Sequence, residues 1–112
     1  MSDDIEWGLK QTPQSEAMKL KEIKMGVAYA VTITDLRNTS NGFVVASVES
    51  KDLVGDTLWL KGKFGLQNGA AKLIQLCNGS TDPVDYIGKT FLVSKVENQD
   101  SMTGYNYDWD HA

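Results

Sequence analysis

The stretch Val27-Ala-Tyr-Ala-Val-Thr-Ile-Thr34 alternates larger apolar side chains with small or polar ones. A period of two is typical of a β-strand that buries one face. The turn sequence Asn38-Thr-Ser-Asn-Gly42 follows, and its Asn-Gly pair is a strong hairpin signal. The Val-rich segment Phe43 to Glu49 comes next. We therefore predict an antiparallel hairpin made of the first two strands.

Three further segments carry a strand pattern. Thr57 to Phe64 alternates cleanly after a turn at Lys51 to Asp56. Lys89 to Glu97 and Gly104 to Trp109 are predicted as the fourth and fifth strands. The alternation of the third strand predicts three inward side chains, Leu58, Leu60 and Phe64.

One helix is predicted between the third and fourth strands, over Asn68 to Asn78. Its apolar side chains recur at helical spacing, at Ala70, Leu73, Ile74 and Cys77. Asn68 is the expected N-cap, and Gly79 stands where a left-handed C-terminal cap is favoured. Three strands, a helix and two more strands predict a mainly β fold, a five-stranded OB-type Greek-key barrel.

The length of 112 residues fits one domain. We expect residues 1–24 to be a partly ordered N-terminal leader, with a short helix around Glu16 to Lys21. Residues 25–109 are predicted to form the OB-fold domain. Residues 110–112 are left as a short acidic C-terminal tail.

The net charge of -4 is unevenly distributed. Residues 1–9 hold three acidic and no basic side chains, and residues 96–112 hold four acidic and no basic ones. All 11 Lys and Arg residues lie in 10–95, against eight acidic residues. Because the local field rather than the total charge governs a contact, the basic body can bind a polyanion.

The sequence also indicates a compartment. No apolar run approaches the roughly 20 residues of a membrane span, so no membrane partner is expected. The N-terminus is acidic where a secretory signal would be basic. Cys77 is the only cysteine, which favours a reducing compartment, the cytoplasm.

Enzymatic chemistry finds little support, and we expect a protein that is not an enzyme. The only histidine, His111, is the penultimate residue, and Cys77 lies on the apolar helix stripe, where a thiol is inert. Asp108 and Asp110 share a strand face but lack a third ligand, so no metal site is predicted. No phosphate-binding glycine loop occurs, and no cofactor is expected.

The third strand carries the clearest binding signal. Alternation places Trp59, Lys61 and Lys63 together, opposite the leucines. An aromatic ring beside two cations suits single-stranded nucleic acid, because a base stacks on the ring and phosphates meet the ammonium groups. The alternative is that Trp59 covers the barrel end or a dimer contact while the lysines keep the surface soluble.

For the other aromatic residues, the strand pattern allows more than one placement. Phe43 and Phe91 each begin a strand, and the core interpretation is favoured for both, although Phe43 could also stack a base. The C-terminal run Gly104 to Ala112 alternates aromatic with polar or acidic residues. It is either a last strand that extends the binding surface, a mobile tail that docks on a partner or competes for the basic groove, or an edge strand protected by its charges.

Two segments resemble a known family. Phe64-Gly-Leu-Gln-Asn-Gly-Ala-Ala-Lys-Leu-Ile-Gln-Leu-Cys-Asn-Gly79 and Asp85-Tyr-Ile-Gly-Lys-Thr-Phe-Leu-Val93 look like the small bacteriophage single-stranded-DNA-binding proteins with an OB fold. The resemblance covers about residues 26–109. It implies sequence-tolerant binding of single-stranded DNA in phage replication or recombination, in the bacterial host cytoplasm.

The hypothesis is therefore a single-stranded-DNA-binding protein, with RNA as an open alternative. The expected contacts are stacking on Trp59, Phe43, Tyr105 and Tyr107 and phosphate binding by Lys61, Lys63, Lys72 and Lys89. A homodimer is left open, as is a replication or recombination protein that binds the C-terminus. The competing hypothesis is a protein-interaction module, a phage factor that engages or inhibits a host protein through its acidic and aromatic ends.

Overall fold

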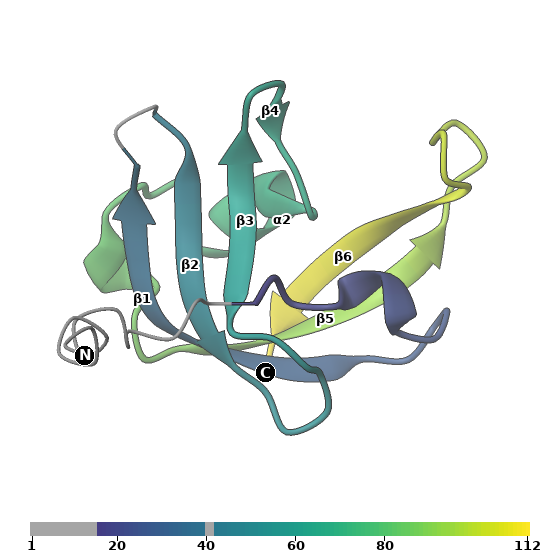
Figure 1. The fold of residues 1–112 in the computed structure, drawn as a ribbon, viewed down its shortest axis with the longest axis horizontal. Helices are drawn as coiled ribbons and strands as arrows, with labels where there is room; N and C mark the ends of the chain where they lie inside the picture. The colour runs from purple at the N-terminus through teal and green to yellow at the C-terminus, as the bar shows by residue number, and fades with distance from the viewer. Residues whose placement is uncertain (1–15, 40–41) are drawn as a thin grey trace, which may run out of the picture.

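A computed structural model describes residues 16–39 and 42–112 (Figure 1). The elements in chain order are η1 (Leu20–Glu22), β1 (Tyr29–Asn38), β2 (Val44–Glu49), β3 (Thr57–Gly62), β4 (Gly65–Leu66), α2 (Ala70–Leu76), η2 (Pro83–Asp85), β5 (Thr90–Glu97) and β6 (Tyr105–His111). The strands form one antiparallel sheet in the order β4-β3-β2-β1-β5-β6. The mainly β class and the helix between the third strand and the last hairpin are confirmed. The two-residue strand β4 is an addition to the five predicted strands.

Strand β1 is shared between two halves of the sheet. Its first residues, from Tyr29 to Thr32, pair with β5, and the stretch from Thr32 to Asn38 pairs with β2. The register shifts between Ile33 and Asp35, which marks a β-bulge. A bulge bends a strand and increases its twist. The sheet therefore curls, and β5 and β6 run at an angle to β1, β2 and β3 (Figure 1).

The curled sheet stays open between β3 and β6 in the part of the chain that the structure describes. No ladder joins β3 to β6 among the residues that the structure describes, so the predicted closed barrel is not confirmed. Asn68 spans the gap instead. Its side-chain Nδ2 donates to the Trp59 carbonyl on β3 at 2.6 Å, and its own carbonyl accepts from Trp109 Nε1 on β6 at 2.7 Å.

The segment 16–26, which we call the strap, spans the other end of the gap. The Met18 amide donates to the Thr57 carbonyl at 2.8 Å, and the Gly26 amide donates to the Lys95 carbonyl at 2.9 Å. Figure 1 shows this purple segment running from the foot of β3 across β6. Met18 and Leu20 belong to the hydrophobic core. This part of the predicted leader is thus built into the fold, and the rest of it, residues 1–15, lies outside the described residues.

The core lies between the concave face of the sheet, α2 and the strap. Among its fully buried side chains, the largest are Trp109, Phe91, Ile33, Leu58 and Leu73. The core placement predicted for Phe91 and Cys77 is confirmed. Phe43 is half-buried and outside the core cluster, so the core interpretation of this residue is wrong.

Two details of the predicted elements are corrected. Strand β3 ends at Gly62 and the chain turns into β4, so Phe64 leaves the inner face and is 95% exposed. Helix α2 is shorter than predicted, and its N-cap is Gly69, because Asn68 has φ 57° and uses its amide for β3. The predicted cap at Gly79 is confirmed, with φ 78° and an N–H bond to the Ile74 carbonyl.

The short helix predicted around Glu16 to Lys21 is also corrected. In the structure this region begins extended beside β3 and contains only the 3-10 turn η1. The reason is that the Glu16 carbonyl accepts from the Thr57 amide and the Met18 amide donates to the Thr57 carbonyl. Backbone groups that are committed to a neighbouring strand cannot take part in a local helix.

We predict that Gly69→Ala destabilises the fold more than Gly79→Ala does. Both glycines have φ near +75°, where an alanine costs about 1–2 kcal/mol. A Cβ on Gly69 would also lie 2.6 Å from the Tyr107 carbonyl oxygen and 2.9 Å from Trp109 Nε1, whereas one on Gly79 meets nothing within 4 Å. In urea unfolding, the free energy of unfolding should fall by about 1 kcal/mol or more further for Gly69→Ala than for Gly79→Ala, which is the scale of a lost hydrogen bond. Equal losses for the two variants would contradict the prediction.

Candidate nucleic-acid interface

Trp59 stands on the outer face of β3, away from the core. Its cross-strand neighbour is Val45 on β2, and the Phe43 ring packs edge-to-face on the indole with centroids 6.0 Å apart. Both rings are half-buried, so part of each face is open to solvent. Phe43 leaves the core because its ring completes this outer aromatic pair.

Two cations flank the aromatic pair. Lys61 follows Trp59 by two residues on β3 and is exposed, as predicted. Arg37 joins from β1, because the register aligns Arg37 with Val45 and Val45 with Trp59. Its Nε lies 3.5 Å from Asp35, and its Nη2 donates to Ser47 Oγ at 3.4 Å. The sequence pattern missed Arg37, because only the bulge turns this residue outward.

Lys63 is separated from this row. The residue lies in the turn after β3, with its Nζ 5.6 Å from the centroid of the neighbouring Phe64 ring. The register also shifts between Val44, the partner of Lys61, and Val45, the partner of Trp59, so the predicted common face of Trp59, Lys61 and Lys63 is not confirmed. Lys63 is exposed at the tip of the β3–β4 hairpin.

A second aromatic pair stands on β6. The Tyr105 and Tyr107 rings meet edge-to-face with centroids 5.6 Å apart. The ammonium of Lys95 lies 4.1 Å from the Tyr105 centroid and donates to the Lys21 carbonyl of the strap at 2.8 Å. Lys95 is only 8% exposed. Burial, with the adjacent Tyr105, raises the pKa of Tyr107, so the ring stays neutral at physiological pH.

Trp59 of the first aromatic pair and both tyrosines of the second line two adjoining surface depressions, which together we call the groove. Its first part is lined by Trp59, Gln67, Asn68, Tyr107 and strap residues 17–21. Its second part shares Gln67, Asn68 and Tyr107 and adds Lys72, Thr103 and Tyr105. The groove therefore follows the open gap between β3 and β6. Lys19 and Lys21 are exposed here, although the sequence pattern had placed them in a leader without predicted packing.

Lys89 lies apart from the other predicted contacts. This residue lines a separate depression with Ser80, Asp85 and His111. Ser80 Oγ donates to the Asp85 carboxylate, and His111 ends β6 with its ring 6.1 Å from that of Phe91. Within residues 16–39 and 42–112, no group of three or more His, Cys, Asp or Glu side chains could hold a metal ion.

The buried thiol and phenol next to this depression are held neutral. Burial raises the pKa of Cys77, whose Sγ donates to the Asp85 carbonyl at 3.6 Å. Burial also raises the pKa of Tyr86 to about 12, and its hydroxyl donates to the Ser80 carbonyl. A thiol with a raised pKa is a poor nucleophile.

No protein-family model matches the chain, and neither a curated protein nor a solved structure matches it. Among the described helices, none is long and apolar enough to cross a membrane.

We predict that Cys77 reacts slowly with Ellman's reagent in the folded protein. The thiolate is the reacting form, and burial both raises the pKa and blocks access. Labelling at mildly alkaline pH should be at least about tenfold slower without denaturant than in urea. Equal rates in the two conditions would contradict the buried placement of this thiol.

Proposed function

We propose that this protein binds single-stranded DNA without sequence preference along most of its contact surface. One observation carries the proposal: the groove brings Trp59 and Tyr107 to one depression that is bordered by lysines from the strap and from α2. Stacking of bases on aromatic rings with lysines near the phosphates is the general chemistry of sequence-tolerant single-strand binding.

The topology supports an OB-like interpretation of the open sheet. One long bent strand pairs with both β2 and β5, and a helix lies between the third strand and the last hairpin. OB-type barrels bind oligonucleotides on the face of their second and third strands and with nearby loops. Trp59, Phe43 and Arg37 occupy the corresponding outer face here. From the resemblance of two segments to phage proteins, we further propose that this activity serves phage replication or recombination.

The charge distribution fits this proposal. Exposed cations line the groove at Lys19, Lys21 and Lys72, and two more, Arg37 and Lys61, are exposed outside its lining on β1 and β3. The acidic residues Asp108 and Asp110 alternate along β6 with the inward Tyr107 and Trp109, so they face away from it. An acidic chain can therefore present a basic surface to a phosphate backbone.

A protein-interaction module is the competing function, and exposed Asp108 and Asp110 are the observation that favours it. Removing residues 105–112 is not a clean test, because Trp109 of β6 is in the core. Failure of the wild-type protein to bind oligonucleotide at low salt would favour this alternative.

We predict that Trp59→Ala weakens binding to oligo(dT) by about 1–3 kcal/mol, the value of one stacked base. Anisotropy of a labelled oligonucleotide is the suitable measurement, because it does not depend on protein fluorescence. Phe64→Ala is the matched control, since this ring is fully exposed at the hairpin tip outside the groove. If Trp59→Ala binds oligo(dT) with the affinity of the wild type, the binding site does not include this face of β3.

We also predict that Lys61→Ala reduces the salt dependence of binding. A lost phosphate contact lowers the slope of log K against log salt by about 0.7 for single strands. Lys89→Ala is the control, because Lys89 lies outside the groove and should leave the slope unchanged. A reversed pattern, with the slope reduced only by Lys89→Ala, would move the phosphate path to the opposite depression.

A further inference from the structure

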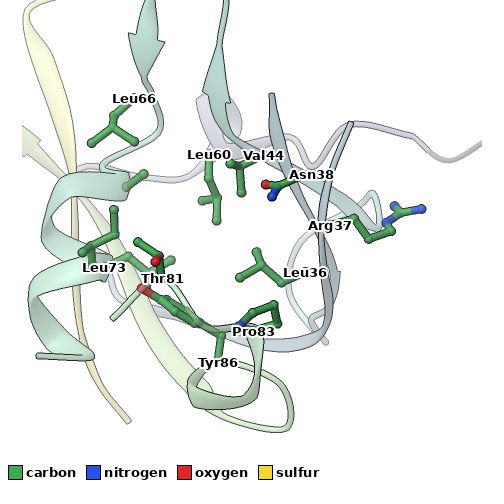
Figure 2. A pocket seen from close by; sticks show the side chains of 12 residues that line it. Leu36, Arg37, Asn38, Val44, Leu60, Leu66, Leu73, Thr81, Pro83 and Tyr86 are labelled. Carbon is green, nitrogen blue, oxygen red and sulfur yellow. The ribbon is translucent and has the colours of Figure 1, made fainter. Parts of the chain in front are cut away.

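An apolar cavity of about 220 Å³ opens at the end of the curled sheet. Its wall is formed by the inner faces of β1, β2 and β3 together with α2 and η2, and includes Leu36, Val44, Leu60, Leu73 and Tyr86. Figure 2 shows these side chains converging on one space. An engineered apolar cavity of about 150 Å³ binds benzene, so this one is large enough for a bigger ring system.

Two polar side chains line the same cavity. The amide of Asn38 stands beside Val44, and the hydroxyl of Thr81 lies on the opposite side (Figure 2). Neither side chain forms a hydrogen bond with any residue in the described part of the chain. An asparagine amide offers one donor edge and one acceptor, the pair that matches the edge of a nucleobase.

The cavity and the outer aromatic face lie on opposite sides of the same strands. Arg37 precedes Asn38 on β1, and its guanidinium points away from the cavity in Figure 2. Phe43, which packs on Trp59, directly precedes Val44 of the cavity wall. The cavity also shares two wall residues, Leu66 and Ala70, with the second part of the groove. A nucleic-acid strand in the groove therefore passes next to the cavity at these two side chains.

We propose that the cavity takes one nucleobase of the bound strand, with the base edge on the Asn38 amide. This inference rests on the proposed function. Insertion of the base covers Leu66, an apolar wall residue that is 51% exposed. Stacking on Trp59 tolerates every base, whereas the amide distinguishes them. The protein then has one base-selective position within an otherwise sequence-tolerant contact.

The test compares oligo(dT), oligo(dA) and oligo(dC) binding to wild type and to Asn38→Leu. We expect wild-type affinities to differ by about fivefold or more between the best and worst base, the lower end of one amide–base pair. The Asn38→Leu variant should bind all three oligonucleotides with the affinity that the wild type has for the one it binds most weakly. Gln75→Leu, which makes the same chemical change at an exposed position on α2, should retain the difference. If Asn38→Leu does not fold, Val44→Phe fills the cavity from β2 and carries the same expectation.

The outcomes separate this inference from the proposed function. Equal wild-type affinities that Asn38→Leu leaves unchanged would overturn the cavity proposal alone. No binding of any oligonucleotide at low salt would overturn the proposed function. Free nucleosides then decide whether the cavity accepts a base without a strand: amide and methyl NMR shifts at Leu36, Leu73 and Tyr86 would support it, and their absence would exclude it.

Discussion

The Asn68–Gly69 turn is the constraint on which the rest of the structure depends. One side-chain amide donates to the Trp59 carbonyl of β3, and the adjacent carbonyl accepts from the Trp109 indole of β6. Gly69 lies so close to Tyr107 that only a residue without a side chain fits. This turn links β3 and β6, which share no ladder among the described residues. Two hydrogen bonds of one residue take the place of a ladder, so the sheet curls but does not close into a barrel.

The same arrangement accounts for the candidate interface. A continuous ladder between β3 and β6 would fill the space that the groove occupies. Because the turn bridges β3 and β6 at one place and the strap joins β3 to β5 at another, Trp59 on β3 and Tyr107 on β6 both line the depression between these contacts. Lys95 links these parts, since its ammonium contacts both the Tyr105 ring and the strap carbonyl of Lys21. The contacts that close the fold are therefore the same contacts that form the groove.

Local pattern predicted much of this fold and less of its site. Alternation placed β2, β3, β5 and β6 and the inward Leu58 and Leu60, because a strand's period is encoded by neighbouring residues. The bulge after Ile33 has no local signal, so Arg37 was missed. The departure of Phe64 from the inner face depends on where β3 ends. The strap follows from pairing with β3 and β5, which depends on residues far away along the chain.

The strap and the turn also have a kinetic consequence. The contacts that close the gap join residues that are distant in sequence: 74 positions separate Lys21 from Lys95, and 41 separate Asn68 from Trp109. Contacts of such separation carry a high loop-closure cost and slow folding, while hairpins such as β1–β2 form from near neighbours. The groove is thus assembled from long-range contacts, as is the β1–β5 ladder that joins the two halves of the sheet. A partly folded molecule can hold its local hairpins and still have no surface on which a base could stack.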